Sequence, residues 1–365
     1  MSLFYSKLYA LRAGVIDCAC ALPGTGDADG RSDRWRLSAS FACAIIAQAL
    51  LLTSLPIVGG MIAPSPALAN LPYALTWLGA ALASFPASIL VDQFGRRAAF
   101  ALGASTGLAG GLLAAWAAAK GHFAALCIGA IWLGIAQGFA LFYRHAGATQ
   151  QGRAQTILTV MVGGCVAAFL VPALVAFAAR AYAPFTDCAL LIFAGAASVA
   201  ALPLILTLPH ATAVARTGTR KLASRPFWIA TALSTAAWGI MAHVMGAAPH
   251  ALVDCGIGGV AIGGLISWHF LAMYAPLAVG ARLRAALGTW NVALIAAALL
   301  AAALAYVPSN GALIEARLLA GGIGWSLAQI ASAALLEKAE SPTRSQLALH
   351  DTLIFVSALA SLLAA

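Results

Sequence analysis

The stretch LPYALTWLGAALASFPASILVDQFGRRAAFALGASTGLAGGLLAAWAA, residues 71–118, decides the fold of this chain. Two apolar runs, 71–91 and 98–118, flank a short segment that carries Asp92, Arg96 and Arg97. A helix rises about 1.5 Å per residue, so about 20 residues cross the ~30 Å hydrocarbon core of a bilayer. Each run therefore predicts a membrane-spanning helix, and the charged segment predicts a connection outside the hydrocarbon.

The composition extends this prediction to the whole chain. Of the 365 residues 62% are hydrophobic and 8% are charged, and the mean hydropathy is +0.94. A water-soluble domain cannot bury that much apolar surface. Transmembrane strands would be shorter and would alternate apolar with polar residues. The sequence predicts an all-α polytopic membrane protein.

About eleven spans are expected, each bounded by a charged, Pro-rich or Gly-rich break. Their approximate limits are 37–60, 71–91, 98–118, 122–143, 155–179, 185–208, 227–248, 258–280, 289–307, 314–336 and 347–365. The longest polar interruption divides them into two bundles. The predicted organisation is a tail at 1–36, a six-helix bundle at 37–208, a central loop at 209–226 and a bundle of about five helices at 227–365.

The distribution of Lys and Arg predicts the orientation. If the N-terminus is cytoplasmic, 17 of the 20 Lys and Arg lie on the cytoplasmic side, and only Lys120, Arg180 and Arg317 lie on the other. Cytoplasmic loops carry such an excess. The net charge of +9 is scattered over short loops instead of forming one basic stripe, so nucleic acid is not an expected partner. Membrane lipid is one.

The segment between the second and third spans resembles the cytoplasmic loop signature of the major facilitator superfamily, G-x-x-x-D-R-x-G-R-R. The matching residues are Asp92, Gly95, Arg96 and Arg97, whereas Ser88 and Gln93 depart from it. The resemblance implies a transporter whose two bundles rock about a central site, with this loop as a gate. Members of the superfamily normally have twelve helices, so the twelfth is expected to be missing.

Four side chains indicate the transported substrate. Met241 and Met245 lie four residues apart on the seventh span, as do His269 and Met273 on the eighth, so each pair shares a helix face. Thioether sulfur and imidazole nitrogen form a soft ligand set of the kind that selects Cu(I). The same two motifs resemble those of a bacterial subgroup that includes copper importers of the CcoA type. The resemblance implies copper import across a bacterial inner membrane.

Other readings of these residues stay open. Met in a membrane helix is commonly packing material, and His269 could be a hydrogen-bonded structural residue. The same subgroup includes a riboflavin importer, for which Trp238, Trp268, Phe270 and Tyr274 would form aromatic walls. A membrane assembly factor without transport is a third possibility.

Several further residues are candidate soft-metal ligands. They are Met161 and Cys165 on the fifth span, Cys255 and His250 near the outer loop, and Cys18 and Cys20 in the tail, which could pass an imported ion to a cytoplasmic metal acceptor. Seven scattered Cys do not form a disulfide framework.

The sequence holds no signature of an enzyme. It lacks a phosphate-binding Gly-rich loop and a nucleophile with base and orienting acid. No resident cofactor is expected. All eleven Asp and Glu are placed in the tail, in loops or at helix ends, so any proton coupling is expected to use His269.

Overall fold

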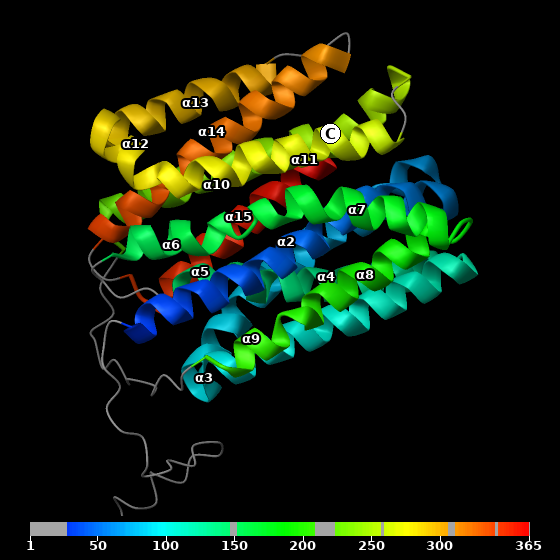
Figure 1. Ribbon diagram of the computed structural model, residues 1–365, viewed down its shortest axis with the longest axis horizontal. Coiled ribbons are helices and arrows are strands. Elements are labelled where there is room, and N and C mark those ends of the chain that lie inside the picture. The colour runs from blue at the N-terminus through cyan, green and yellow to red at the C-terminus, as the bar shows by residue number, and fades with distance from the viewer. Residues whose placement is uncertain are drawn as a thin grey trace, which may run out of the picture.

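The protein is all-helical in its computed structural model, which describes residues 28–146, 152–208, 223–256, 259–305, 311–339 and 342–364. The helices run roughly alongside one another as a single bundle (Figure 1). Their bounds are α2 Ala28–Ile62, α3 Leu71–Lys120, α4 Phe123–Leu141, α5 Tyr143–Ala146, α6 Arg153–Val162, α7 Cys165–Ala181, α8 Thr186–Ala200, α9 Leu202–Leu206, α10 Arg225–Asp254, α11 Gly259–Tyr274, α12 Gly280–Leu287, α13 Thr289–Ala305, α14 Gly311–Lys338 and α15 Arg344–Leu363, with short 3-10 turns at Pro66–Leu68 and Ala275–Val279.

The number of membrane passes agrees with the prediction. Nine helical segments of the described residues are long and apolar enough to cross a membrane, and one of them, Pro66–Lys120, is 55 residues long and contains a sharp break. Counting its two arms separately, and including the shorter Thr289–Ala305, gives eleven helical passes within the described chain. Many large side chains that point outward are apolar, among them Trp35, Phe169 and Leu294. Such a surface suits contact with lipid.

The break within α3 lies at Gly95, inside the charged segment between the predicted spans 71–91 and 98–118. Gly95 has φ 79° and ψ 165°, a conformation that is essentially restricted to glycine. The chain therefore leaves one membrane arm, 71–94, and enters the next, 96–120, at this residue. The second arm packs closely on α4 because Gly110 and Gly129 face each other: a Cβ added to Gly129 would lie 2.9 Å from the Gly110 carbonyl oxygen.

The helices form two groups that meet along the centre of the molecule. Helices α2 to α9 pack mainly on one another, as do α10 to α15 (Figure 1). Contacts between the groups run chiefly through α3 with α15 and α7 with α11. The predicted domain limits stay a prediction at the central loop, because residues 209–222 lie outside the described residues.

Two helix starts explain how charged residues reach the bundle. Helix α2 already begins at Ala28, ahead of the predicted limit at 37, and its Asp33 pairs with Arg96 at 2.7 Å. That pairing explains why the polar start of α2 joins the bundle.

Helix α15 starts with a reciprocal cap. The Thr343 side chain accepts from the backbone N–H of Gln346, and the Gln346 side chain accepts from the backbone N–H of Thr343. The rest of the predicted tail lies outside the described residues.

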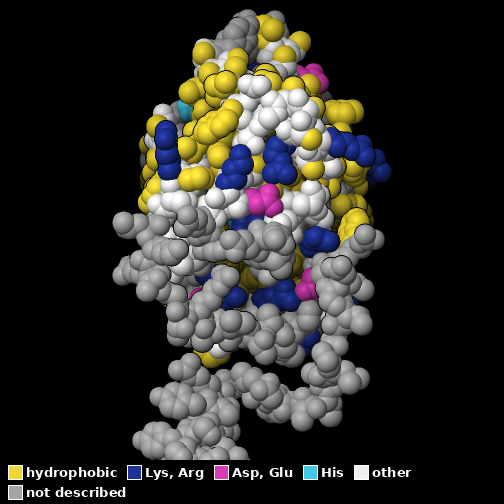
Figure 2. Space-filling model, turned by 90° about the vertical axis from the view of Figure 1, so that its left-hand side faces the viewer, with side chains coloured by type: hydrophobic (Ala, Val, Ile, Leu, Met, Phe, Trp, Pro, Cys, Tyr) yellow, Lys and Arg dark blue, Asp and Glu magenta, His cyan; other side chains and the backbone are white. Residues whose placement is uncertain are grey.

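One end of the bundle carries most of the charged contacts. Figure 2 shows Lys and Arg side chains gathered there, with a few acidic ones among them, on the face that lies at the left in Figure 1. We call this the basic end and define it by Arg96, Arg97, Arg284 and Arg344.

Candidate functional site

Two small cavities adjoin at the centre of the bundle, between the two helix groups. The first, called the sulfur cavity, has a volume of about 40 Å³. Its lining residues are Gln48, Leu52, Tyr73, Trp77, Trp238, Met241, Ala242, Met245, His269, Phe270, Met273 and Tyr274. The second, called the amide cavity, has a volume of about 20 Å³ and shares Gln48, Trp77 and Trp238 with the first. A buried water needs at least about 10–15 Å³ of such space, so each cavity holds only one to a few waters.

The four predicted soft donors all line the sulfur cavity. Met241 and Met245 come from α10, and His269 and Met273 come from α11. The four-residue spacing puts each pair on one helix face, and both faces turn toward the same space. All four side chains are buried, with 0% exposure for His269 and no more than 5% for the others. The structure thus brings together the four residues singled out from the sequence.

His269 is held in a defined orientation. Its Nδ1 lies 2.8 Å from the Leu318 carbonyl oxygen on α14. A carbonyl oxygen can only accept, so Nδ1 carries the proton and donates. The other nitrogen, Nε2, is buried and has no hydrogen-bond partner among the described residues. Metal-binding histidines are commonly fixed in this way, with one nitrogen donating to a carbonyl and the other left as the ligand.

Aromatic rings surround the sulfur cavity from both helix groups. Trp238 meets Trp77 edge to face at 5.9 Å and Trp325 at 5.2 Å between ring centroids, and Trp325 meets Tyr274 at 5.3 Å. Phe270 stacks on Tyr274 at 6.2 Å. The expectation that Trp268 joins this wall is wrong, because its side chain is 60% exposed on the outer face of α11. Trp268 is next to His269 in sequence, so it points about 100° away around the helix.

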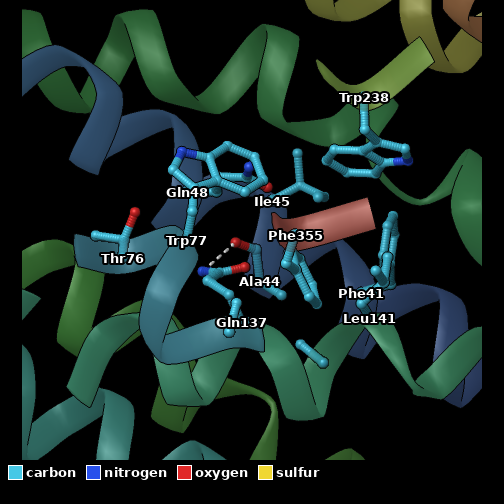
Figure 3. Close-up of a pocket in the computed structure, with 12 residues that line it drawn as sticks. Phe41, Ala44, Ile45, Gln48, Thr76, Trp77, Gln137, Leu141, Trp238 and Phe355 are labelled. Carbon is cyan, nitrogen blue, oxygen red and sulfur yellow. Dashed lines mark hydrogen bonds between the residues drawn. The ribbon is translucent and has the colours of Figure 1, made fainter. Parts of the chain in front are cut away.

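The amide cavity contains polar side chains that the sequence reasoning missed. Figure 3 shows the rings of Trp77, Trp238 and Phe355 around it, with the amide of Gln137 reaching in. The Gln137 Nε2 donates to the Ala44 carbonyl oxygen at 3.1 Å. Gln48 belongs to both cavities. A carboxamide within an apolar span is costly without a partner, and that is the signal by which both Gln could have been found.

The remaining metal candidates do not reach the cavities. Met161 is fully buried, and its sulfur accepts from Arg144 at 4.0 Å. Cys165 is partly buried and Cys255 is exposed just after α10. Among the described residues no group of three or more His, Cys, Asp or Glu could hold a metal ion. Cys18, Cys20 and the side chain of His250 lie outside the described residues.

The gate residues at the Gly95 bend bind other helices. Asp92 pairs with Arg344 at the start of α15, in the other helix group. Arg96 pairs with Asp33 on α2, and Arg97 donates to the carbonyl of Leu208 after α9. Asp92 thus connects the Gly95 bend to the other helix group.

A buried ion pair also connects the two groups, and the sequence analysis placed one partner wrongly. Asp351 was expected near a helix end, but it lies two turns inside α15 with 0% exposure. Its Oδ1 accepts from Arg144 at 2.6 Å, and Nε2 of His145 lies 3.3 Å from the same oxygen. The described residues thus do include a carboxylate buried within a membrane helix. The sequence did contain a signal for this, because Asp351 falls within the predicted span 347–365.

Together these features define a class of protein: a multi-pass membrane protein whose two helix groups enclose central cavities. The chain belongs to the Major Facilitator Superfamily, whose sequence profile matches residues 37–361. Membership of this family makes it a membrane transporter.

Relatives and solved structures agree with this family. The riboflavin transporter RfnT of Brucella anthropi is 32% identical over 320 residues, which cover 81% of this chain and 80% of that protein. Similar folds occur in the human organic anion transporter MFSD10 (TM-score 0.65, 14% identity, 91% of each chain covered). A mutant of the nucleoside transporter NupG (0.62, 15%, 91% of this chain and 90% of that one) is also similar. A bacterial homologue of the iron transporter ferroportin in its outward-facing state is similar as well, with a TM-score of 0.60 and 12% identity over 90% of this chain and 91% of that one.

Proposed function

We propose that this transporter imports copper, as Cu(I), toward the cytoplasm of a bacterial cell, with its basic end on the cytoplasmic side of the inner membrane. The observation that carries the proposal is the sulfur cavity, where three thioethers and one imidazole from two helices surround about 40 Å³ of buried space. This donor set suits a soft, low-coordinate ion, whereas Mg²⁺ and Ca²⁺ require oxygen ligands.

The size of the cavity supports a small cargo. A single ion needs no more space than one or two waters, so it fits between the helices in the conformation described here. Met241, Met245 and Met273 keep the lining apolar apart from their sulfurs, and His269 offers one free nitrogen. An ion bound by few soft donors can be handed on without a strongly held resident site. The proposed receiver is a cytoplasmic metal acceptor.

Radioactive copper uptake by cells that express the chain tests this proposal. Met241→Leu, Met245→Leu and Met273→Leu remove the sulfur while nearly conserving volume, and His269→Gln removes the imidazole. Each is expected to lower uptake about tenfold or more, because even loss of an outer-shell partner of a metal ligand costs about 10–100-fold in affinity or activity. Met61→Leu is the matched control, since Met61 is 68% exposed and far from the cavities. Unchanged uptake in all four variants at equal membrane abundance would overturn the copper assignment.

Uptake of a flavin is a second candidate. It is supported by the 32% identity to a riboflavin transporter and by the rings of Trp77, Trp238 and Phe270 beside the amides of Gln48 and Gln137. A flavin would need much more space, since pockets for such ligands measure about 300–1,000 Å³. The cavities would have to merge and widen.

The same uptake assay with labelled riboflavin separates the two candidates. Copper import predicts a loss in the Met and His variants and no riboflavin signal. Flavin import predicts a loss with Trp238→Leu and none with Met245→Leu. Absence of both fluxes in liposomes that hold folded protein would favour the assembly factor.

A further inference from the structure

A cluster of buried charged and titratable side chains joins the two helix groups between the cavities and the basic end. The Arg144 guanidinium donates to Asp351 Oδ1 at 2.6 Å, and both side chains are at most 2% exposed. His145 Nε2 lies 3.3 Å from Asp351 Oδ1 and 3.3 Å from Arg144 Nε. His350, next to Asp351 on α15, places its ring 6.3 Å from that of His145. We call these four residues the charged cluster.

The charged cluster closes the amide cavity on the side of the basic end. Leu141 and Phe355 line that cavity. Arg144 follows Leu141 by three residues at the end of the α4 and α5 segment, and Asp351 precedes Phe355 by four on α15. Spacings of three and four place residues on one helix face about a turn apart. The pair therefore lies one turn beyond the cavity in both helix groups, across the path from the cavity to the basic end.

Three buried polar atoms of the cluster have no hydrogen-bond partner among the described residues: Asp351 Oδ2, His145 Nδ1 and His350 Nε2. The tautomer of His350 follows from its neighbour. The Thr231 hydroxyl donates to the Phe227 carbonyl at 2.9 Å, so it accepts from His350 Nδ1 at 2.9 Å. Nε2 of His350 is then a free lone pair. Buried polar atoms without partners are rare in native proteins, and a cluster of them indicates a site that binds something.

The charges around the cluster decide what it can bind. Arg144 and Arg153 contribute positive charge, from α5 and α6. Asp351 contributes the negative charge, from α15. Among the described residues, helix α10 contributes the Thr231 hydroxyl and the Phe227 ring. The Tyr274 phenol at the end of α11 lies close enough to Arg144 for an electrostatic interaction. A metal cation would meet two guanidinium groups, which disfavours it. A proton neutralises the carboxylate without needing a coordination shell.

We propose that the charged cluster is a proton-binding site that locks the basic end of the transporter. With Asp351 ionised, its attraction to Arg144 holds the two helix groups together. A proton taken up by Asp351, directly or through His145, removes that attraction and leaves the buried guanidinium without an anion. Water can then solvate Arg144 only if the basic end opens, so the proton favours the open conformation.

Proton binding to Asp351 and opening of the basic end favour each other. In the closed conformation Arg144 stabilises the ionised carboxylate, whereas in the open conformation the carboxylate has lost that partner and holds a proton more tightly. Lower pH therefore shifts the population toward the open conformation. This inference rests on membership of the superfamily and not on the nature of the cargo.

Distance measurements between two spin labels test the lock without any cargo. One label replaces Phe94, 55% exposed beside the bend of α3, and the other replaces Leu287, 41% exposed at the end of α12, in a full chain whose native Cys are changed to Ser. These positions lie at the basic end in opposite helix groups. Between about pH 8 and pH 4 the ratio of long to short distances is expected to rise, by at most about tenfold per pH unit for one proton.

Variants of the cluster make the result specific. Asp351→Asn mimics the protonated carboxylate and is expected to give long distances at both pH values, whereas Asp351→Glu restores the pH response. Asp187→Asn, which removes a carboxylate from the first turn of α8, is the control and should behave as wild type. Distances that do not change with pH in the wild-type chain, or that stay short in Asp351→Asn, would overturn the lock. Copper and riboflavin uptake can fail while this result stands.

Discussion

The ion pair between Arg144 and Asp351 gives the sharpest prediction about stability. Its partners are 2% and 0% exposed and lie 2.6 Å apart. Removing one partner of such a pair leaves a buried charge uncompensated and costs about 3–5 kcal/mol, whereas replacing both by apolar residues is often close to neutral. Arg144→Met and Asp351→Leu alone should each destabilise the fold by about that amount. The double variant should lose far less than the sum.

Opening of the basic end would make the measured losses of stability smaller than this range, and never larger. The 3–5 kcal/mol refers to the closed conformation, and a single variant can escape part of the cost by opening the basic end so that water reaches the remaining charge. Measured losses in the single variants should therefore fall at or below this range. His145 and His350 stay in place in all three variants, so the coupling measured is that of the pair within its own cluster.

Equilibrium unfolding of the purified protein in SDS, followed by the fluorescence of its nine Trp, gives the three free energies of unfolding. Arg180→Met is the matched control, since Arg180 is exposed and should change stability by no more than about 0.5 kcal/mol. A double variant that loses as much as the two single variants together would refute the reasoning, because the two charges would then not be coupled.

The remaining predictions concern the backbone and the surface. Gly129→Val should destabilise the fold by about 1–3 kcal/mol in the same SDS titration, because its Cβ would meet the facing helix at under 3 Å. Gly60→Ala is the control, since no atom lies within 4 Å of a Cβ added there. Equal losses of stability in the two variants would contradict the packing argument. Gly95→Ala should cost about 1–3 kcal/mol from backbone strain alone, since open space surrounds its Cβ; a cost near zero would show that the bend tolerates a side chain. Asp92→Asn breaks an exposed contact with Arg344, 53% and 43% exposed, so it should cost under about 1 kcal/mol and less at high salt; a loss of several kcal/mol would contradict this.

Much of the fold could be predicted because it is written locally. Apolar runs of about 20 residues give the spans, and the charged break at Asp92 gives the turn that the structure bends at Gly95. The sulfur cavity was predictable for the same reason, since a spacing of four puts Met241 with Met245 and His269 with Met273 on common faces. Only the structure shows that these two helix faces turn toward the same cavity.

The charged cluster could not be predicted from local patterns. Arg144 and Asp351 are 207 residues apart in the chain, and no periodicity says that one meets the other. Read alone, Asp351 sits near the start of an apolar run and resembles a residue at a helix end. The amide cavity was missed because Gln48 and Gln137 come from spans that are otherwise apolar, and the partner of each is settled only by packing.

The hydrogen bond from His269 to Leu318 connects the proposed copper ligand to a second helix. The imidazole is carried by α11 and the carbonyl by α14, so these two helices share one proton at the wall of the sulfur cavity. A slide of α14 along α11 by about 2 Å, across the direction of this bond, stretches the N to O distance from 2.8 Å to about 3.5 Å, beyond a useful hydrogen bond. The ring is then free to rotate about its side-chain torsions, and Nε2, the proposed copper ligand, turns away from the cavity. In the proposed copper site, binding and release of the ion would then depend on the relative position of α11 and α14.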